Sequence, residues 1–181
     1  MADVFEVIKG RRSVREYKQE QIEDEDIEKI LHAAIMAPTA RGEAPWHFTV
    51  VQNKELLDDI NKSVHEILKS SGDEFLEAIG KSDKNVMHNA PTVIIVSAKS
   101  TASNMQADCS AAIENMLLAA EGLDIGSCWL GLITAYFSVE ENLKTLHIPE
   151  GYTPLYGVSL GYKVNENQPN PRKDVLINWL K

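Results

Sequence analysis

The chain has 181 residues, of which 44% are hydrophobic and 25% charged, and these values are ordinary for a single soluble globular domain (residues 1–181). Its formal net charge of -9 argues against nucleic acid or an anionic membrane surface as the main partner, because both favour a basic face. The polar N-terminus and the shortness of every apolar run predict a chain without signal peptide or membrane span, and we expect a cytoplasmic protein.

Apolar residues at helical or strand spacing, bounded by capping residues, glycine and proline, predict the regular elements. In chain order they are helices over 3–9 and 24–36, a strand over 46–51, helices over 54–70 and 73–79, a strand over 92–98, a helix over 104–121, a helix from a Ser138–Glu141 capping box to Leu146, and a strand over 153–161. Residues 81–89 are compatible with a helix or a loop, and 126–131 are predicted to be a glycine-bounded turn. Helices and strands in this order predict mixed α/β layers around one sheet.

The basic stretch Gly10–Arg15 is the first candidate site. An extended chain places Arg11, Ser13 and Arg15 on one side, while a helix would spread them around its axis. Guanidinium groups bind phosphate oxygens in a bidentate way and stay charged at any working pH. The stretch therefore predicts a cradle for an anion such as a phosphate. A basic surface loop that offsets an acidic body is the alternative.

Two later segments indicate a subunit interface. The helix over 104–121 is apolar almost all round and rich in alanine, which allows close approach by another helix. The chain then closes with a Pro- and Asn-rich linker over 165–171 and an apolar end. Disordered tails lack large apolar side chains, so we expect this end to dock on a neighbouring subunit.

Four pieces together carry a resemblance to a known family: Arg11–Arg15, Pro38–Trp46, Gly126–Gly131, and Leu160–Tyr162 followed by Pro171-Arg172. In this order and at these separations the chain resembles the nitroreductase family of FMN-dependent oxidoreductases over essentially its whole length. The resemblance implies an α+β fold: a three-layer α/β/α sandwich with a mixed, mostly antiparallel sheet. It also implies a homodimer with FMN at the subunit interface and a C-terminal arm, here residues 165–181, crossing to the partner.

The resemblance also implies roles for single residues. Arg11 and Arg172 would hold the FMN phosphate, with Arg12 assisting and Ser13 contacting the ribityl chain or phosphate. Arg15 would reach the flavin pyrimidine edge, where a cation stabilises the negative charge of reduced flavin. Pro38, Thr39 and Ala40 would pack against the flavin ring of the partner subunit. The backbone at Leu130 and Gly131 would lie near flavin N5 and O4.

The implied activity is ping-pong hydride transfer from NAD(P)H through flavin N5 to a small acceptor such as a nitroaromatic or a quinone. No side chain is expected to act as a catalytic residue, and no metal is expected. Relatives commonly carry Asn and Gln where this chain has Gly42 and Ala44, so a flavin carrier or sensor with little turnover is an alternative. Reductive dehalogenation and flavin fragmentation are further options. The acceptor, the preference between NADH and NADPH, and the flavin potential are left open.

Other polar residues are interpreted structurally. His32 is expected to be a partly buried structural residue, and His65 and His88 are expected on surface segments. The acidic run 23–26 fits a solvated helix start, where carboxylates favour the helix dipole. Trp129 is expected in the core, and Arg41 on the exposed face of its loop, with an acidic substrate or the nucleotide's phosphates as its alternative partner. Two buried free thiols complete the set: Cys109 and Cys128.

Overall fold

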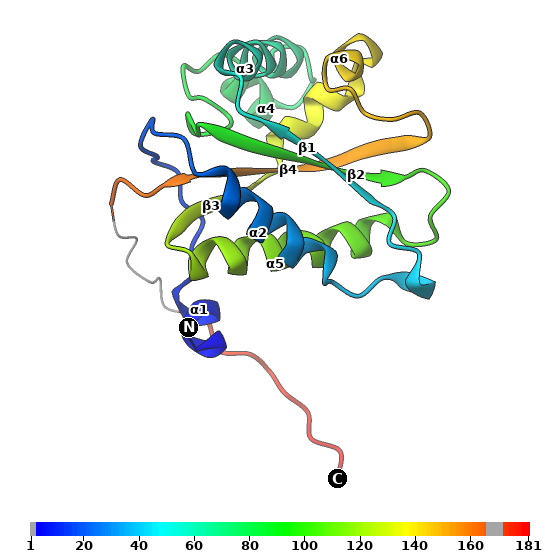
Figure 1. Ribbon diagram of the computed structural model, residues 1–181. Coiled ribbons are helices and arrows are strands. Elements are labelled where there is room, and N and C mark those ends of the chain that lie inside the picture. The colour runs from blue at the N-terminus through cyan, green and yellow to red at the C-terminus, as the bar shows by residue number, and fades with distance from the viewer. Residues whose placement is uncertain (1–2, 166–171) are drawn as a thin grey trace.

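A four-stranded antiparallel sheet forms the centre of the computed structural model, which describes residues 3–165 and 172–181 (Figure 1). Its spatial order is β1 (Trp46–Val51), β2 (Thr92–Lys99), β4 (Tyr152–Tyr162) and β3 (Ile125–Leu130). All three neighbouring pairs run antiparallel. The only parallel pairing among the described residues is an isolated bridge between Ser13 and Ser127, so the predicted mostly antiparallel sheet is confirmed.

Helices cover both faces of this sheet, as the predicted three-layer sandwich requires (Figure 1). One face carries α2 (Asp24–Ile35) and α5 (Met105–Gly122), with α1 (Val4–Gly10) beyond the end of α5. The other face carries α3 (Lys54–Leu68), α4 (Glu74–Gly80) and α6 (Glu140–Thr145). Two short 3₁₀ segments join these elements: Ala40–Gly42 and Leu132–Ser138.

The alternation of apolar side chains on β2 divides the core between the two faces. Ile94 and Val96 pack with α2 and α5 in one cluster of buried residues. Val93 and Ile95 pack with α3 and the second 3₁₀ segment in another. All four side chains are completely buried, which explains why this strand was predictable as a continuous apolar run.

Three local predictions need correction or completion. The stretch predicted as a glycine-bounded turn is strand β3, which ends at Leu130. The predicted capping box at the start of α6 is wrong, because Ser138 donates its hydroxyl to Ala135 O and Val139 precedes the helix without a side-chain cap. Residues 81–89 form turns rather than a helix, with His88 and Asn89 in the left-handed region.

The histidines also differ in part from expectation. His32 is exposed, because it lies on the outer face of α2, so its prediction as a partly buried residue is wrong. His65 is buried between α3 and the end of α4, where its two ring nitrogens face Gly80 O and Lys84 O, so its surface assignment is wrong as well. Trp129 packs against the core cluster and meets Tyr156 edge to face, and both cysteines are buried, as predicted.

The C-terminal end leaves the body of the molecule (Figure 1). Its apolar side chains are 64–101% exposed in the single chain, and they are Val175, Leu176, Ile177, Trp179 and Leu180. Most of the linker predicted over 165–171 lies outside the described residues, which resume at Arg172.

Candidate functional site

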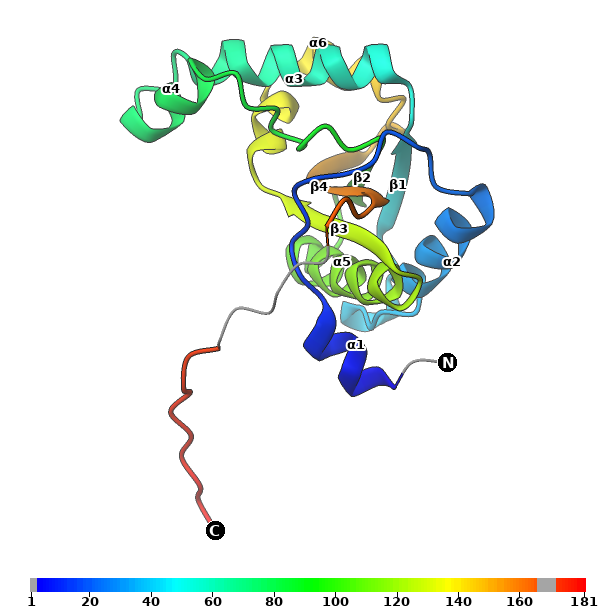
Figure 2. The ribbon, with the colours of Figure 1, turned by 90° about the vertical axis from the view of Figure 1, so that its left-hand side faces the viewer.

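The basic segment 11–17 is extended and lies across the edge of the sheet formed by β3 and β4 (Figure 2). Val14 N donates to Ser127 O at 2.9 Å, and Lys18 N donates to Tyr162 O at 2.9 Å. These bonds hold the segment against the sheet. Val14 and Tyr17 are buried, whereas Ser13, Arg15 and Glu16 are exposed.

Two glycines allow this close approach. A Cβ on Gly126 would lie 2.9 Å from Val14 Cγ1, and a Cβ on Gly161 would lie 3.0 Å from Tyr17 Cδ1. Both distances are shorter than ordinary contacts, so a larger residue at either position would push the basic segment away from the sheet. Two hydrogen bonds also hold Tyr17. Its hydroxyl donates to Val14 O at 2.7 Å and lies 2.9 Å from Ser159 Oγ.

Two of the three arginines in this stretch, Arg11 and Arg15, lie with Ser13 where the cradle is predicted, and the third, Arg12, turns away from them. Ser13 and Arg15 are exposed, and Arg11 Nε lies 3.7 Å from Glu114 Oε1 of α5. Arg12 instead donates from Nη1 to Lys9 O at 2.7 Å and to Arg11 O at 2.6 Å. Its guanidinium therefore caps the C-terminal carbonyls of α1.

The charge of Arg15 acts on two titratable side chains, Cys128 and His88. Burial raises the pKa of the Cys128 thiol, and the charge of Arg15 and a hydrogen bond from Ser13 oppose that shift. Burial lowers the pKa of His88, and the charge of Arg15 lowers it further, which favours a neutral imidazole at neutral pH. Burial also raises the pKa of Cys109 to about 12, so neither thiol is a reactive thiolate.

The end of β3 adds an open stretch of backbone to this side of the molecule. Leu130 is buried, whereas Gly131 is exposed, and a Cβ on Gly131 would meet no atom within 4 Å. Backbone groups here can therefore be approached closely by a flat ligand. The register places this stretch on the strand that pairs with the basic segment through Ser127.

The loop that contains Pro38, Thr39 and Ala40 lies at the start of α5. Ala40 N donates to Asp108 Oδ1 at 2.9 Å, and Asp108 belongs to the first turn of that helix. Arg11 contacts Glu114, six residues further along α5, which corresponds to about 9 Å of helix rise. Within one chain, the loop and the cradle therefore occupy different positions along the same helix. Arg172 begins the exposed C-terminal end that leaves the body (Figure 2).

Sequence reasoning missed several residues of this region. Asp108 and Glu43 hold the 38–45 loop, and His88 reaches the neighbourhood of Arg15 from a turn that precedes β2. The one carboxylate in the first turn of a largely apolar helix was the available signal for Asp108. His88 had no such signal, because its place depends on two left-handed residues.

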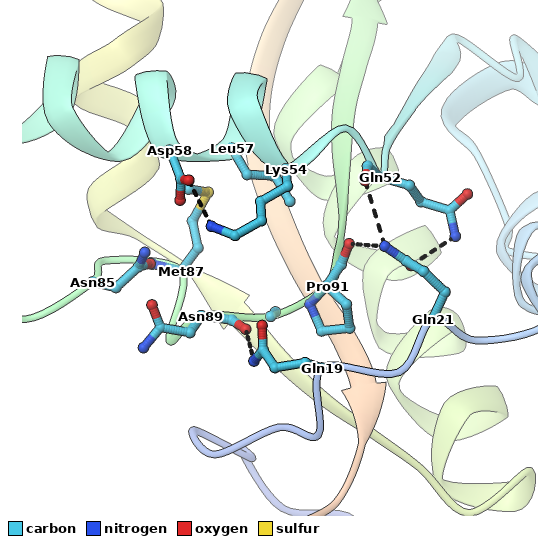
Figure 3. Close-up of a pocket in the computed structure, with 11 residues that line it drawn as sticks. Gln19, Gln21, Gln52, Lys54, Leu57, Asp58, Asn85, Met87, Asn89 and Pro91 are labelled. Carbon is cyan, nitrogen blue, oxygen red and sulfur yellow. Dashed lines mark hydrogen bonds and ion pairs between the residues drawn. The ribbon is translucent and has the colours of Figure 1, made fainter.

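A small polar hollow of roughly 90 Å³ lies apart from the predicted site residues (Figure 3). Its side-chain amides mostly bond within the protein: Gln21 donates to Pro91 O at 2.9 Å and accepts from Gln52 Nε2 at 3.0 Å. These bonds join the chain before α2 to the adjacent ends of β1 and β2, which indicates a structural role. The hollow is lined by Gln19, Gln21, Gln52, Lys54, Leu57, Asp58, Asn85, Met87, Asn89, Ala90 and Pro91.

Two further observations concern the described residues only. Within 3–165 and 172–181 no three His, Cys, Asp or Glu side chains gather as metal ligands would. None of the helices in those ranges combines the length and apolar character needed to cross a bilayer.

The sequence matches a family model described as the nitroreductase family over residues 8–162. A protein of Archaeoglobus fulgidus, provisionally named an NADH dehydrogenase/NAD(P)H nitroreductase, is 39% identical over 175 residues, which are 92% of this chain and 88% of the relative. A similarly named protein of Methanothermobacter thermautotrophicus is 37% identical over 88% of this chain and 77% of its own length.

Solved structures agree in fold over the whole chain. A nitroreductase with bound FMN from Bacteroides fragilis is 35% identical and superposes with a TM-score of 0.88, covering 100% of both chains. Another nitroreductase with bound FMN, from Desulfitobacterium hafniense, is 28% identical with a TM-score of 0.90, again over 100% of both chains.

Proposed function

This chain belongs to the nitroreductase family, and on that basis we propose that it is an FMN-dependent oxidoreductase. The proposed reaction is ping-pong hydride transfer from NADH or NADPH to a small organic acceptor such as a nitroaromatic or a quinone. The observation that carries the proposal is the extended segment at the edge of the sheet, which holds exposed Ser13 and Arg15 with partly exposed Arg11 beside them. The two FMN-bound neighbours of the same fold support it.

The residues present fit FMN in charge and in shape. Two guanidinium groups and a hydroxyl are the donors that a phosphate or an anionic pyrimidine edge would accept. The open backbone at Gly131 leaves room for a flat ring, and the buried Val14 anchors the segment that carries the donors. When bound, FMN would supply the hydride-accepting N5 through which both half-reactions run.

The side chains of the protein would bind the cofactor, orient it and stabilise the negative charge of its reduced form. Arg11, and Arg172 from the C-terminal end, would hold the phosphate, while Ser13 orients the ribityl side. Arg15 would place a fixed cation at the pyrimidine edge, which favours the reduced cofactor. The described residues need no nucleophile for this chemistry, and the thiols of Cys109 and Cys128 are kept protonated by burial.

We further propose that the enzyme is a homodimer in which the arm 165–181 crosses to the partner. The C-terminal apolar side chains are exposed in the single chain, so a second subunit would give them a surface to cover. Pro38, Thr39 and Ala40 would then pack against the partner's cofactor. A cytoplasmic location stays a prediction of the sequence.

The first experiment is the absorbance spectrum of the purified protein, followed by release and identification of the cofactor. We expect flavin bands and FMN in a ratio of about one per chain for the homodimer proposed. Rapid mixing with NADH or NADPH under anaerobic conditions should then bleach the flavin band. A colourless protein that also fails to bind added FMN would contradict the proposal.

A flavin carrier or sensor is the second candidate function. It is favoured by Gly42 and Ala44, which stand in the loop where the family commonly has amide side chains and which are both exposed. In that case the protein would bind FMN but the flavin band would persist for minutes after NADH or NADPH is added. Bleaching within the mixing experiment excludes this candidate.

A further inference from the structure

The loop between α2 and β1 has an unusual backbone for its composition. Arg41, Gly42 and Ala44 have φ angles of 55°, 67° and 44°, all in the left-handed region. Only glycine adopts this region without a steric cost, so Arg41 and Ala44 keep it only if surrounding contacts hold the loop.

Two carboxylates supply such contacts from opposite directions. Asp108 Oδ1, on the first turn of α5, accepts from Ala40 N at 2.9 Å. Glu43 Oε2, on the loop itself, accepts from Ser103 N at 2.8 Å just before α5 begins. Within the loop, Thr39 Oγ1 accepts from Ala44 N at 3.2 Å. Hydrogen bonds at both ends of the loop, at Ala40 and at Glu43, therefore hold it against the start of α5.

Burying the Asp108 side chain costs desolvation free energy. Asp108 is 4% exposed, and its Oδ2 is buried without a hydrogen-bond partner among the described residues. An unpaired buried carboxylate oxygen is unfavourable, and a neutral Asn or Ser could accept from Ala40 N with less desolvation. We interpret the side-chain oxygen of Asp108 as the acceptor that holds the strained loop through Ala40 N.

Glu43 is the exposed counterpart. The hydrogen bond from Ser103 N lowers the pKa of Glu43, and the charge of Arg41 lowers it further. The Glu43 carboxylate is therefore ionised at neutral pH and accepts a charge-assisted bond from Ser103 N.

We propose that Asp108 is a positioning residue, with Glu43 as its second fastener, which fixes Pro38–Ala40 as a rigid wall of the flavin and acceptor site. The inference rests on the proposed function, because that function gives the loop its place beside a flavin. A wall ordered before binding avoids the entropic cost of ordering it when cofactor or acceptor binds. Neither carboxylate needs to touch the reacting atoms.

Trypsin tests the fastening on the cofactor-free protein. Arg41 is exposed and is the only Lys or Arg between Lys29 and Lys54, so cleavage after it yields fragments 1–41 and 42–181. We expect Asp108→Ala to raise the rate of this cleavage by about fivefold or more, because the loop would open locally. Asp108→Asn should restore the wild-type rate in large part, since its Oδ1 can accept from Ala40 N.

Two further variants separate local loosening from general instability. Glu43 is exposed, so Glu43→Ala should fold even if Asp108→Ala does not, and it should also accelerate cleavage at Arg41. His65→Gln replaces a buried imidazole on the opposite face of the sheet and should leave the Arg41 rate unchanged relative to cleavage elsewhere. Equal acceleration in His65→Gln, or none in Asp108→Ala and Glu43→Ala, would overturn the proposal.

The loaded enzyme gives a second readout. We expect Asp108→Ala to raise KM for the acceptor several-fold with kcat within about twofold, because positioning rather than chemistry is lost. The visible circular dichroism of bound flavin should change as well, and Asp108→Asn should recover both. Unchanged KM and dichroism in a folded Asp108→Ala would overturn the positioning role. If the wild type binds no FMN, the proposed function fails, while the trypsin comparison still decides whether the carboxylates hold the loop.

Discussion

Arg11 and Arg12 are neighbours in the sequence, yet their side chains have different tasks in the structure. Arg11 is partly exposed and lies 3.7 Å from the carboxylate of Glu114, whereas Arg12 donates to the carbonyls of Lys9 and Arg11. We expect Arg11→Ala to raise the FMN dissociation constant by about tenfold or more, since a charge-assisted hydrogen bond contributes about 1.5–3 kcal/mol. Fluorescence quenching on titration with FMN measures the change.

Arg12→Ala is the matched control for this experiment. It removes the same charge one residue away, so it should shift FMN affinity less than Arg11→Ala and should mainly loosen α1. Arg172→Ala should resemble Arg11→Ala, because both ends of the chain are proposed to hold the phosphate. FMN affinity that stays at the wild-type value in both Arg11→Ala and Arg172→Ala would contradict the cradle.

The lowered pKa of Glu43 predicts that its hydrogen bond from Ser103 N is lost at low pH. Its pKa is lowered from the ordinary value of 4.5, chiefly by the Ser103 N–H. A lowered pKa means that this carboxylate stabilises the fold above its ordinary pKa and loses that contribution as pH falls through the folded value. The amide resonance of Ser103 in an NMR titration should therefore shift with a midpoint below 4.5 and should not titrate in Glu43→Gln. A midpoint at or above the ordinary value would contradict the prediction.

At the residue scale, sequence reasoning succeeded where side-chain alternation decides the outcome. Ser13 and Arg15 follow from an extended chain, and the structure holds them outward because Val14 packs inward. The alternation could not predict the position of Arg12, because its guanidinium donates to the Lys9 carbonyl at the end of α1. It could not place Asp108 either, because its acceptor role depends on a loop that is distant in sequence.

At the scale of elements, the junction of α3 with the end of α4 depends on one histidine and one glycine. His65 lies between two carbonyls, Gly80 O at 3.1 Å and Lys84 O at 2.9 Å. Gly80 is buried, and a Cβ added there would lie 2.6 Å from Lys69 N and 2.9 Å from His65 O. Backbone atoms cannot move aside cheaply, so this junction needs glycine.

We therefore expect Gly80→Ala to lower the free energy of unfolding by about 1–3 kcal/mol, the usual cost of overpacking. Urea denaturation followed by circular dichroism should show a lower midpoint with an unchanged slope. Gly122→Ala at the end of α5 is the control, because its Cβ would meet only Val7 Cγ2, at 4.0 Å, and alanine favours a helix. An equal loss of stability in both variants would contradict a specific need for glycine at position 80.

The strands with the most apolar sequences were the ones that the sequence predicted correctly. Strands β1 and β2 are rich in β-branched and aromatic residues, and the structure contains both near the predicted bounds. Strand β3 was missed because Gly126, Ser127 and Cys128 carry little strand propensity. Its small residues serve another purpose, the close approach of the basic segment, which only the three-dimensional contacts reveal.

At the scale of the whole molecule, two groups of exposed apolar side chains bear on the proposed dimer. The first is on α1, where Val4, Phe5 and Ile8 are exposed and no residue of the helix is buried. The second is the C-terminal end, which extends away from the body (Figure 1). A monomer rarely leaves so many large apolar side chains in water, so both surfaces favour a partner subunit.

Removal of residues 174–181 is the corresponding prediction. Burying each large apolar side chain contributes about 1.5–3 kcal/mol, so the C-terminal end could supply much of the free energy of association, before the entropic cost of binding. We expect the full chain to sediment as a dimer and the shortened chain to sediment as a monomer with weakened FMN binding. The weakening follows because the proposed site takes Pro38–Ala40 from the partner.

Phe75→Ala provides the control, since Phe75 is a comparably exposed apolar residue on α4, on the opposite face of the sheet from α5. Its loss should leave sedimentation and FMN affinity unchanged, because it is not part of the proposed arm. A shortened chain that still sediments as a dimer would mean that association depends on other surfaces, such as α1 and α5. A full chain that sediments as a monomer at every concentration would contradict the homodimer, and with it a cofactor site shared between two subunits.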